Sequence, residues 1–223
     1  MTPLPSQLLV ITDRHQARHS IEMIAEAVGQ AGGRWLLLRD KNLAPAERRR
    51  LGMRLAEIAT RHRMHLSVSR DVDLAAECGA SAHLQSAATV GAARRRLGRD
   101  ALVGVSTHRL EDVVAAVAAG ADYVTLSPIF TTSSKPGYGP ALGVAAIELA
   151  AKYGISVLAL GGVTADFVRP CLDAGAAGIA VMGEVMRSDD PGRTTSRLLA
   201  ACKAATAAPI SPPVTPEGLV ERP

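Results

Sequence analysis

The chain has 223 residues, enough for one large hydrophobic core and marginal for two domains. Aromatic residues make up only 3% of it, which excludes recognition of single-stranded nucleic acid by stacking on exposed rings, so we expect no nucleic-acid partner. No apolar run reaches the roughly 18 residues that a membrane span needs. The formal charge of +4 fits an anionic ligand.

Eight short apolar runs predict β-strands. Most of them lack the polar–apolar alternation of a half-exposed strand, which is typical of parallel strands covered on both faces. The predicted strands, in chain order, are residues 8–12, 34–39, 65–68, 82–84, 102–105, 123–126, 157–160 and 178–182.

Amphipathic patterns between these runs predict helices. Ile21, Ile24 and Val28 recur at spacings of three and four within residues 20–28. Residues 45–61, 110–118, 145–153 and 165–174 repeat the pattern. Several predicted helices end in a glycine that can adopt the left-handed closing conformation, namely Gly79, Gly120, Gly154 and Gly175.

The junction from helix to strand recurs along the chain. The segments ECGASAHL, AAGADYVTL and DAGAAGIAV each join a helix end to a strand through Gly-Ala. Eight such units in about 200 residues predict a single-domain α/β fold, the (β/α)8 TIM barrel. The alternative is an open doubly wound sheet, which is disfavoured because no Gly-x-Gly-x-x-Gly follows the first strand.

Composition separates the end of the chain from the barrel. We expect the barrel to occupy residues 1–205, and we predict a disordered tail at 206–223 because that segment holds five prolines and few large apolar residues. The three cysteines form no Cys-x-x-Cys pair and are interpreted as buried free thiols. Free thiols fit a reducing compartment, and the start of the sequence shows no signal-peptide pattern. Together these features predict a cytoplasmic location. Arginine triplets at 48–50 and 94–96 are interpreted as solvated helix faces.

Active sites of TIM barrels lie at the carboxyl ends of the strands. Two glycine-containing turns follow the seventh and eighth predicted strands and offer backbone N–H groups that no side chain obstructs. Barrels commonly bind phosphate at this pair of loops. The sequence therefore predicts a phosphate site at Gly161, Gly162, Met182 and Gly183.

The long segment TTSSKPGYGP follows the sixth predicted strand. Loops of this length in a compact barrel are usually lids or ligand clamps. Lys135 within it is a candidate partner for a phosphate or another oxyanion.

The segment GVSTH, residues 104–108, places His108 at the carboxyl end of the fifth strand. Imidazole titrates near neutral pH, so His108 is a candidate for proton transfer at the mouth of the barrel. The alternative is a solvated loop histidine. His83, within a predicted strand, is assigned to the barrel interior or its rim.

Taken as a series, these segments resemble the thiamine phosphate synthase and TenI family. The resemblance spans about residues 8–186 and lies in the order and spacing of LLVITDR, LLLRDK, DVDLA, GVSTH, GADYVTLSPIFTTSSKPGYGPALG, LALGGVT and AGAAGIAVM. It implies a (β/α)8 barrel that is often a homodimer. It also implies a role in thiamine biosynthesis, either in the thiazole branch or in joining thiazole phosphate to the pyrimidine diphosphate.

Synthases of this family hold magnesium pyrophosphate with Gln-x-Arg-x-Lys after the second strand, Asn-Asp after the third and an acidic pair near the fourth. The carboxylates and substrate phosphates share the ion. Here Leu37 stands in place of the glutamine, while Arg39 and Lys41 match. Ser69-Arg70 replaces Asn-Asp, and residues 85–88 contain no carboxylate. The resemblance therefore implies that the metal site has been lost.

The TenI branch lacks those ligands and aromatises a carboxythiazole phosphate by proton transfer, with a histidine at the position of His108. The resemblance thus implies a thiazole tautomerase that needs no metal and acts on a small phosphorylated thiazole. His108 is the expected catalytic residue, and the Gly162 and Gly183 amides are expected to hold the phosphate. The remaining expected substrate contacts are Arg39, Lys41, Ser106 and Lys135.

Two alternatives stay open. A divergent thiamine phosphate synthase would use Mg2+ and a rearranged site built from Arg70 and Asp71, the latter one residue out of place. A non-catalytic barrel would bind thiamine phosphates or a protein partner. The fold alone does not separate these functions, because one barrel hosts many chemistries.

Overall fold

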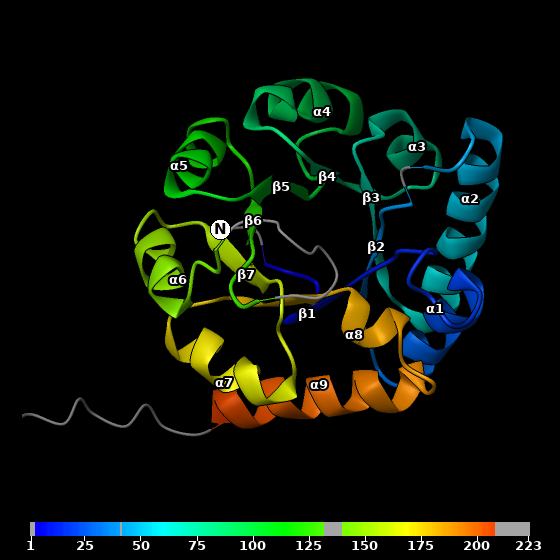
Figure 1. The fold of residues 1–223 in the computed structure, drawn as a ribbon. Helices are drawn as coiled ribbons and strands as arrows, with labels where there is room; N and C mark the ends of the chain where they lie inside the picture. Colours follow the sequence, from blue (N-terminus) through cyan, green and yellow to red (C-terminus); the bar gives the residue numbers. More distant parts are fainter. Residues whose placement is uncertain (1–2, 41, 132–139, 208–223) are drawn as a thin grey trace, which may run out of the picture.

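The computed structural model of the protein describes residues 3–40, 42–131 and 140–207. Eight parallel strands close into a barrel in sequence order, and helices surround it (Figure 1). The predicted single-domain (β/α)8 TIM barrel is confirmed. All eight predicted strands are present, and the largest shift of a boundary is two residues, at the end of the fifth strand (Thr107 in place of residue 105).

The barrel strands are short. Each pairs in parallel with the next, and the last pairs with the first. Their bounds are β1 Leu8–Ile11, β2 Trp35–Leu38, β3 His65–Ser69, β4 Ser81–Leu84, β5 Val103–Thr107, β6 Tyr123–Leu126, β7 Ser156–Leu160 and β8 Gly178–Val181.

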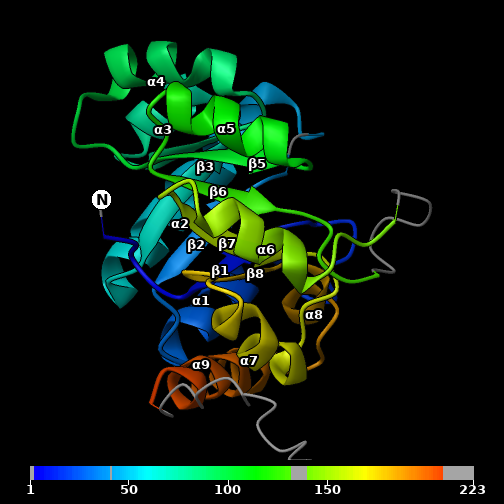
Figure 2. The same cartoon turned by 90° about the vertical axis from the view of Figure 1, so that its left-hand side faces the viewer.

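The helices cover the outside of the barrel. Their bounds are α1 Ile21–Gln30, α2 Pro45–His62, α3 Val72–Glu77, α4 Val90–Leu97, α5 Leu110–Ala118, α6 Val144–Ala151, α7 Ala165–Asp173, α8 Gly183–Met186 and α9 Pro191–Ala207, with a short 3-10 turn at Ala87–Thr89. Figures 1 and 2 show α7 and α9 side by side along one flank. Among the described helices, none combines the length and apolar character needed to cross a membrane.

Local signals explain several helix ends. The side chain of Ser20 accepts a hydrogen bond from Met23 N at the start of α1. The four glycines predicted to close helices all have positive φ, at Gly79, Gly120, Gly154 and Gly175. The last helix runs through Ala207, two residues past the expected end of the barrel, and the rest of the predicted tail, 208–223, lies outside the described residues.

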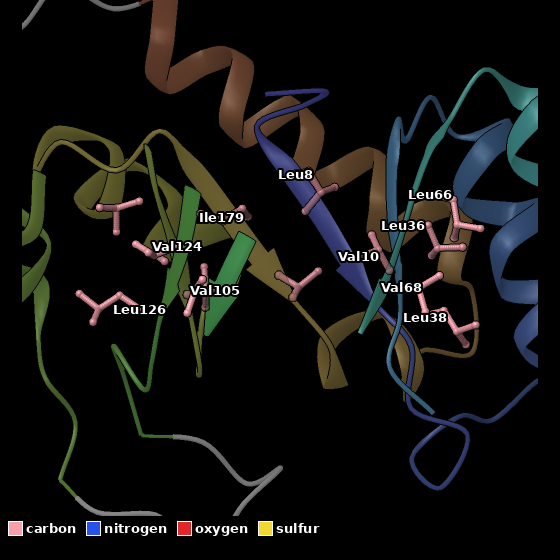
Figure 3. Close-up of a cluster of buried hydrophobic side chains, with 14 of the residues drawn as sticks. Leu8, Val10, Leu36, Leu38, Leu66, Val68, Val105, Val124, Leu126 and Ile179 are labelled. Carbon is pink, nitrogen blue, oxygen red and sulfur yellow. The ribbon is translucent and has the colours of Figure 1, made fainter. Parts of the chain in front are cut away.

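Two apolar layers bury the strands on both faces. Figure 3 shows the outer layer, between strands and helices, which includes Leu8, Val10, Leu36, Leu38, Leu66, Val68, Val105, Val124, Leu126 and Ile179. The inner layer fills the barrel with Leu9, Ile11, Trp35, Leu37, Leu102, Tyr123, Leu158 and Ala180. Burial on both faces accounts for the lack of alternation in the strand sequences.

The interpretation of both arginine triplets as solvated faces is wrong for one residue in each. The Arg48 side chain is only 10% exposed, and it donates to Asp71 Oδ2 at 3.0 Å and to the Ser69 carbonyl at 2.5 Å. Arg94 Nη2 donates to Asp122 Oδ2 at 2.7 Å. Both guanidinium groups tie a helix to the loops at strand ends, where carboxylate and carbonyl oxygens need partners.

Gly104 makes room for an aromatic pair inside the barrel. The rings of Trp35 and Tyr123 meet edge to face with centroids 4.9 Å apart. A Cβ atom added at Gly104 would lie 2.1 Å from Tyr123 Cζ, much closer than packed atoms approach. The first residue of GVSTH is therefore a packing requirement.

We predict that Gly104→Ala destabilises the protein by about 1–3 kcal/mol, because the added methyl group overpacks the barrel interior. Gly91→Ala is the matched control, since its Cβ would meet only Arg95 Nη1, at an ordinary 3.6 Å, within α4. That change should be neutral or stabilising. Urea unfolding of the three proteins measures the difference, and equal stabilities would contradict the packing argument.

Candidate active site at the carboxyl end of the barrel

A cavity of about 640 Å3 opens at the carboxyl ends of the strands, within the size range of small-molecule sites. Residues at the ends of all eight strands line it. Every predicted site residue in the described part of the chain is among them: Arg39, Ser106, His108, Gly161, Gly162, Met182 and Gly183. The other two, Lys41 and Lys135, lie outside the described residues.

His108 is held through its ring and through its backbone N–H. Its ring Nδ1 lies 2.9 Å from the Ser127 carbonyl oxygen, and its backbone N–H donates to Asp112 Oδ2 at 3.0 Å. A carbonyl oxygen only accepts, so the ring donates from Nδ1. The neutral imidazole then carries its lone pair on Nε2, which can accept a proton.

The turn after β7 requires glycine at both positions. Gly161 and Gly162 have φ of +94° and +67°. A Cβ at Gly161 would lie 2.8 Å from Pro128 Cα, and one at Gly162 would lie 2.5 Å from the Thr131 carbonyl oxygen. The turn is packed against the segment after β6, and it presents bare backbone to the cavity.

Arg187 adds a cation beside the second glycine-containing turn. Its side chain lines the cavity and hydrogen-bonds the Gln16 side chain. A Cβ on Gly183 would lie 2.5 Å from Arg187 Cζ, so the guanidinium covers this turn. Sequence reasoning missed Arg187. The only signal was its position one helical turn beyond Gly183, at the end of the four-residue helix α8.

Carboxylates after β1 and β2 fix the loops around Arg39. Asp40 accepts from Thr12 Oγ1 at 2.5 Å and from Arg14 N at 2.7 Å. Asp13 Oδ2 lies 3.4 Å from Arg39 Nη1. Both acids have structural partners, and the Arg39 side chain faces the cavity as a lining cation.

The donor set of the cavity does not fit magnesium. Asp71 is committed elsewhere: Oδ1 accepts from Leu74 N at the start of α3, and Oδ2 pairs with Arg48. It does not line the cavity, so the rearranged site of Arg70 and Asp71 is not formed. Among the described lining residues Glu184 is the one carboxylate, and it pairs with Arg197 at 2.9 Å. No cluster of three or more metal-binding side chains occurs within the described residues.

His83 lies at the floor of the cavity. Its side chain is buried, with Nδ1 3.0 Å from the Tyr123 hydroxyl and Nε2 2.9 Å from Ser106 Oγ. Burial lowers the pKa of His83 to about 4, so the ring is neutral near pH 7. The sequence predicted that His83 lies either in the barrel interior or at its rim, and the structure places it in the interior.

Comparison with known proteins identifies the family of this barrel. A family model described as thiamine monophosphate synthase matches residues 8–185. The chain belongs to the thiamine monophosphate synthase family.

Relatives in this family match over most of their length. The thiamine-phosphate synthase of Shouchella clausii is 33% identical over 207 residues, 91% of this chain and 99% of that one. The thiamine-phosphate synthase of Methanoregula boonei is 39% identical over 171 residues, 75% of this chain and 79% of that one. The solved thiamine phosphate pyrophosphorylase from Pyrococcus furiosus superposes with a TM-score of 0.78 at 26% identity, over 89% of this chain and 96% of that one.

We predict that burial of His83 makes the protein sensitive to mild acid. The pKa is about 4 in the folded state and 6.5 in the reference state, so the unfolded chain binds more protons between these values. Stability therefore falls as the pH drops from about 6.5 to 4, by about 3 kcal/mol in total from this group. Urea unfolding at a series of pH values should show a weaker dependence for His83→Gln, and parallel curves would contradict the assignment.

Proposed function

We propose that the protein is a thiazole tautomerase, which aromatises a carboxythiazole phosphate by moving a proton within the substrate. The observation that carries this proposal is the chemistry of the described lining residues. They supply a histidine with an acceptor nitrogen, two cations and two glycine turns, and they include no set of carboxylates for a metal ion. Proton transfer needs an anchor, a cation and a shuttling group, and it needs no metal.

The roles follow from position in the cavity. Amides at Gly162 and Gly183 bind the phosphate, with Arg187 beside them. Arg39, which lines the cavity after β2, binds the carboxylate. His108 Nε2 removes a proton from one atom of the substrate and returns it to another, so the imidazole is regenerated in each turnover. Lys41 and Lys135 remain proposed contacts to the same anionic groups.

Thiamine phosphate synthase is the second candidate, and the printed names of the relatives favour it over the tautomerase. That reaction releases pyrophosphate, whose charge is usually neutralised by a magnesium ion held on carboxylates. Leu37, Ser69 and Arg70 occupy the positions where family synthases carry the glutamine and the metal-binding pair, which favours the tautomerase. Two assays separate the candidates.

The first assay mixes the protein with the non-aromatic tautomer of carboxythiazole phosphate and follows aromatisation. We expect rapid conversion and a loss of about 10²–10⁴-fold in kcat for His108→Ala, because that variant lacks the proton shuttle. His15→Ala, at an exposed histidine after β1 that does not line the cavity, is the control and should retain full activity. A wild-type rate equal to background would rule out the tautomerase.

The second assay supplies hydroxymethylpyrimidine diphosphate, thiazole phosphate and Mg2+. We expect no pyrophosphate release above background, and we expect EDTA to leave the rate of aromatisation unchanged, because the lining residues that the structure describes offer no set of carboxylates for the ion. Magnesium-dependent pyrophosphate release would establish the synthase instead. Thermal stabilisation by thiazole phosphate without turnover in either assay would support the non-catalytic barrel.

A further inference from the structure

A chain of hydrogen bonds inside the barrel ends at the cavity. The hydroxyl of Tyr123 lies 3.0 Å from His83 Nδ1, and His83 Nε2 lies 2.9 Å from Ser106 Oγ. Tyr123 and His83 are buried, and Ser106 lines the cavity.

The direction of this chain is set at its buried end. A buried hydroxyl proton needs an acceptor, and among the described residues His83 Nδ1 is the hydrogen-bond partner of the Tyr123 hydroxyl. Tyr123 therefore donates its proton to His83 Nδ1.

The tautomer of His83 follows from that direction. A neutral imidazole has one N–H, and a ring that accepts at Nδ1 carries the proton on Nε2. His83 Nε2 then donates to Ser106 Oγ, with Thr125 Oγ1 a longer neighbour at 3.4 Å. Because the Ser106 oxygen accepts this bond, its own proton is directed to an acceptor in the cavity.

We propose that Ser106 donates a hydrogen bond to the substrate anion formed during the reaction, and that His83 is the positioning residue that sets Ser106 in this role. The inference rests on the proposed tautomerase function. Between removal of a proton and its return, the substrate carries an additional negative charge, and a pre-oriented donor stabilises that charge. His108, with its proton on Nδ1, accepts at Nε2, so the two histidines hold opposite tautomers beside one substrate.

The kinetic test uses Ser106→Ala, which removes the donor and little volume. We expect kcat to fall by about 10²-fold with KM little changed, because the contact strengthens only when the anion forms. Ser106→Thr keeps the hydroxyl and should retain most of the activity. His83→Gln should also lower kcat, and the double variant should be no slower than Ser106→Ala alone, because the two residues act through one contact.

The matched control is Ser81→Ala. Ser81 Oγ lies 2.8 Å from His65 Nε2, a second serine–histidine pair of the same barrel that is not part of the cavity lining. Loss of this pair should leave kcat unchanged. An equal loss of kcat in Ser81→Ala and Ser106→Ala would show that the effect of Ser106→Ala comes from altered packing, and it would overturn the proposal.

A measurement that needs no substrate completes the test. Long-range proton–nitrogen correlation spectra of the nitrogen-15-labelled protein near pH 7 should show His83 protonated at Nε2 and His108 at Nδ1. A proton on Nδ1 of His83 overturns the inference whatever the kinetics. An active wild type with an unaffected Ser106→Ala overturns the inference alone, whereas an inactive wild type overturns the proposed function and the role of Ser106 with it.

Discussion

Closure of eight parallel strands into a barrel turns alternate side chains of every strand inward, and the rest of the structure depends on this constraint. The deeper inward positions must be filled, and Trp35 and Tyr123 fill them where Gly104 leaves room. The inward positions nearer the carboxyl ends are then forced into one space. His83, Ser106 and Arg39 meet there although long stretches of sequence separate them.

The same constraint fixes parts of the cavity wall. The turn at Gly161-Gly162 is fixed by close backbone contacts with the segment after β6, so its capacity to receive a phosphate depends on packing. Asp71 also serves the fold, because its carboxylate caps α3 and pairs with Arg48. The fold and its packing therefore do not by themselves assign the reaction.

The positions of the strands and the residues at their ends could be predicted from the sequence, because both follow from local patterns. His108 and the glycine pair could be placed in the site once the strands had been counted. Arg187 could not, because α8 has four residues and no side-chain cap marks its start. The prediction for Arg48 was wrong because charged residues are usually exposed. Which of the three arginines points inward depends on the acceptor at the end of β3, the Ser69 carbonyl. The partners of His83 come from β5 and β6, and no local pattern contains that pairing.

The hydrogen-bonded chain from Tyr123 to Ser106 joins the filling of the barrel interior to the cavity above it. Its buried members fill the interior, and each buried polar atom needs a partner, so the chain would be retained for stability alone. Yet a buried hydroxyl that must donate gives the chain a direction, and the proposed proton position on His83 follows from that direction. The role proposed for Ser106 would then be a consequence of how the core satisfies its polar atoms, without an additional charged group.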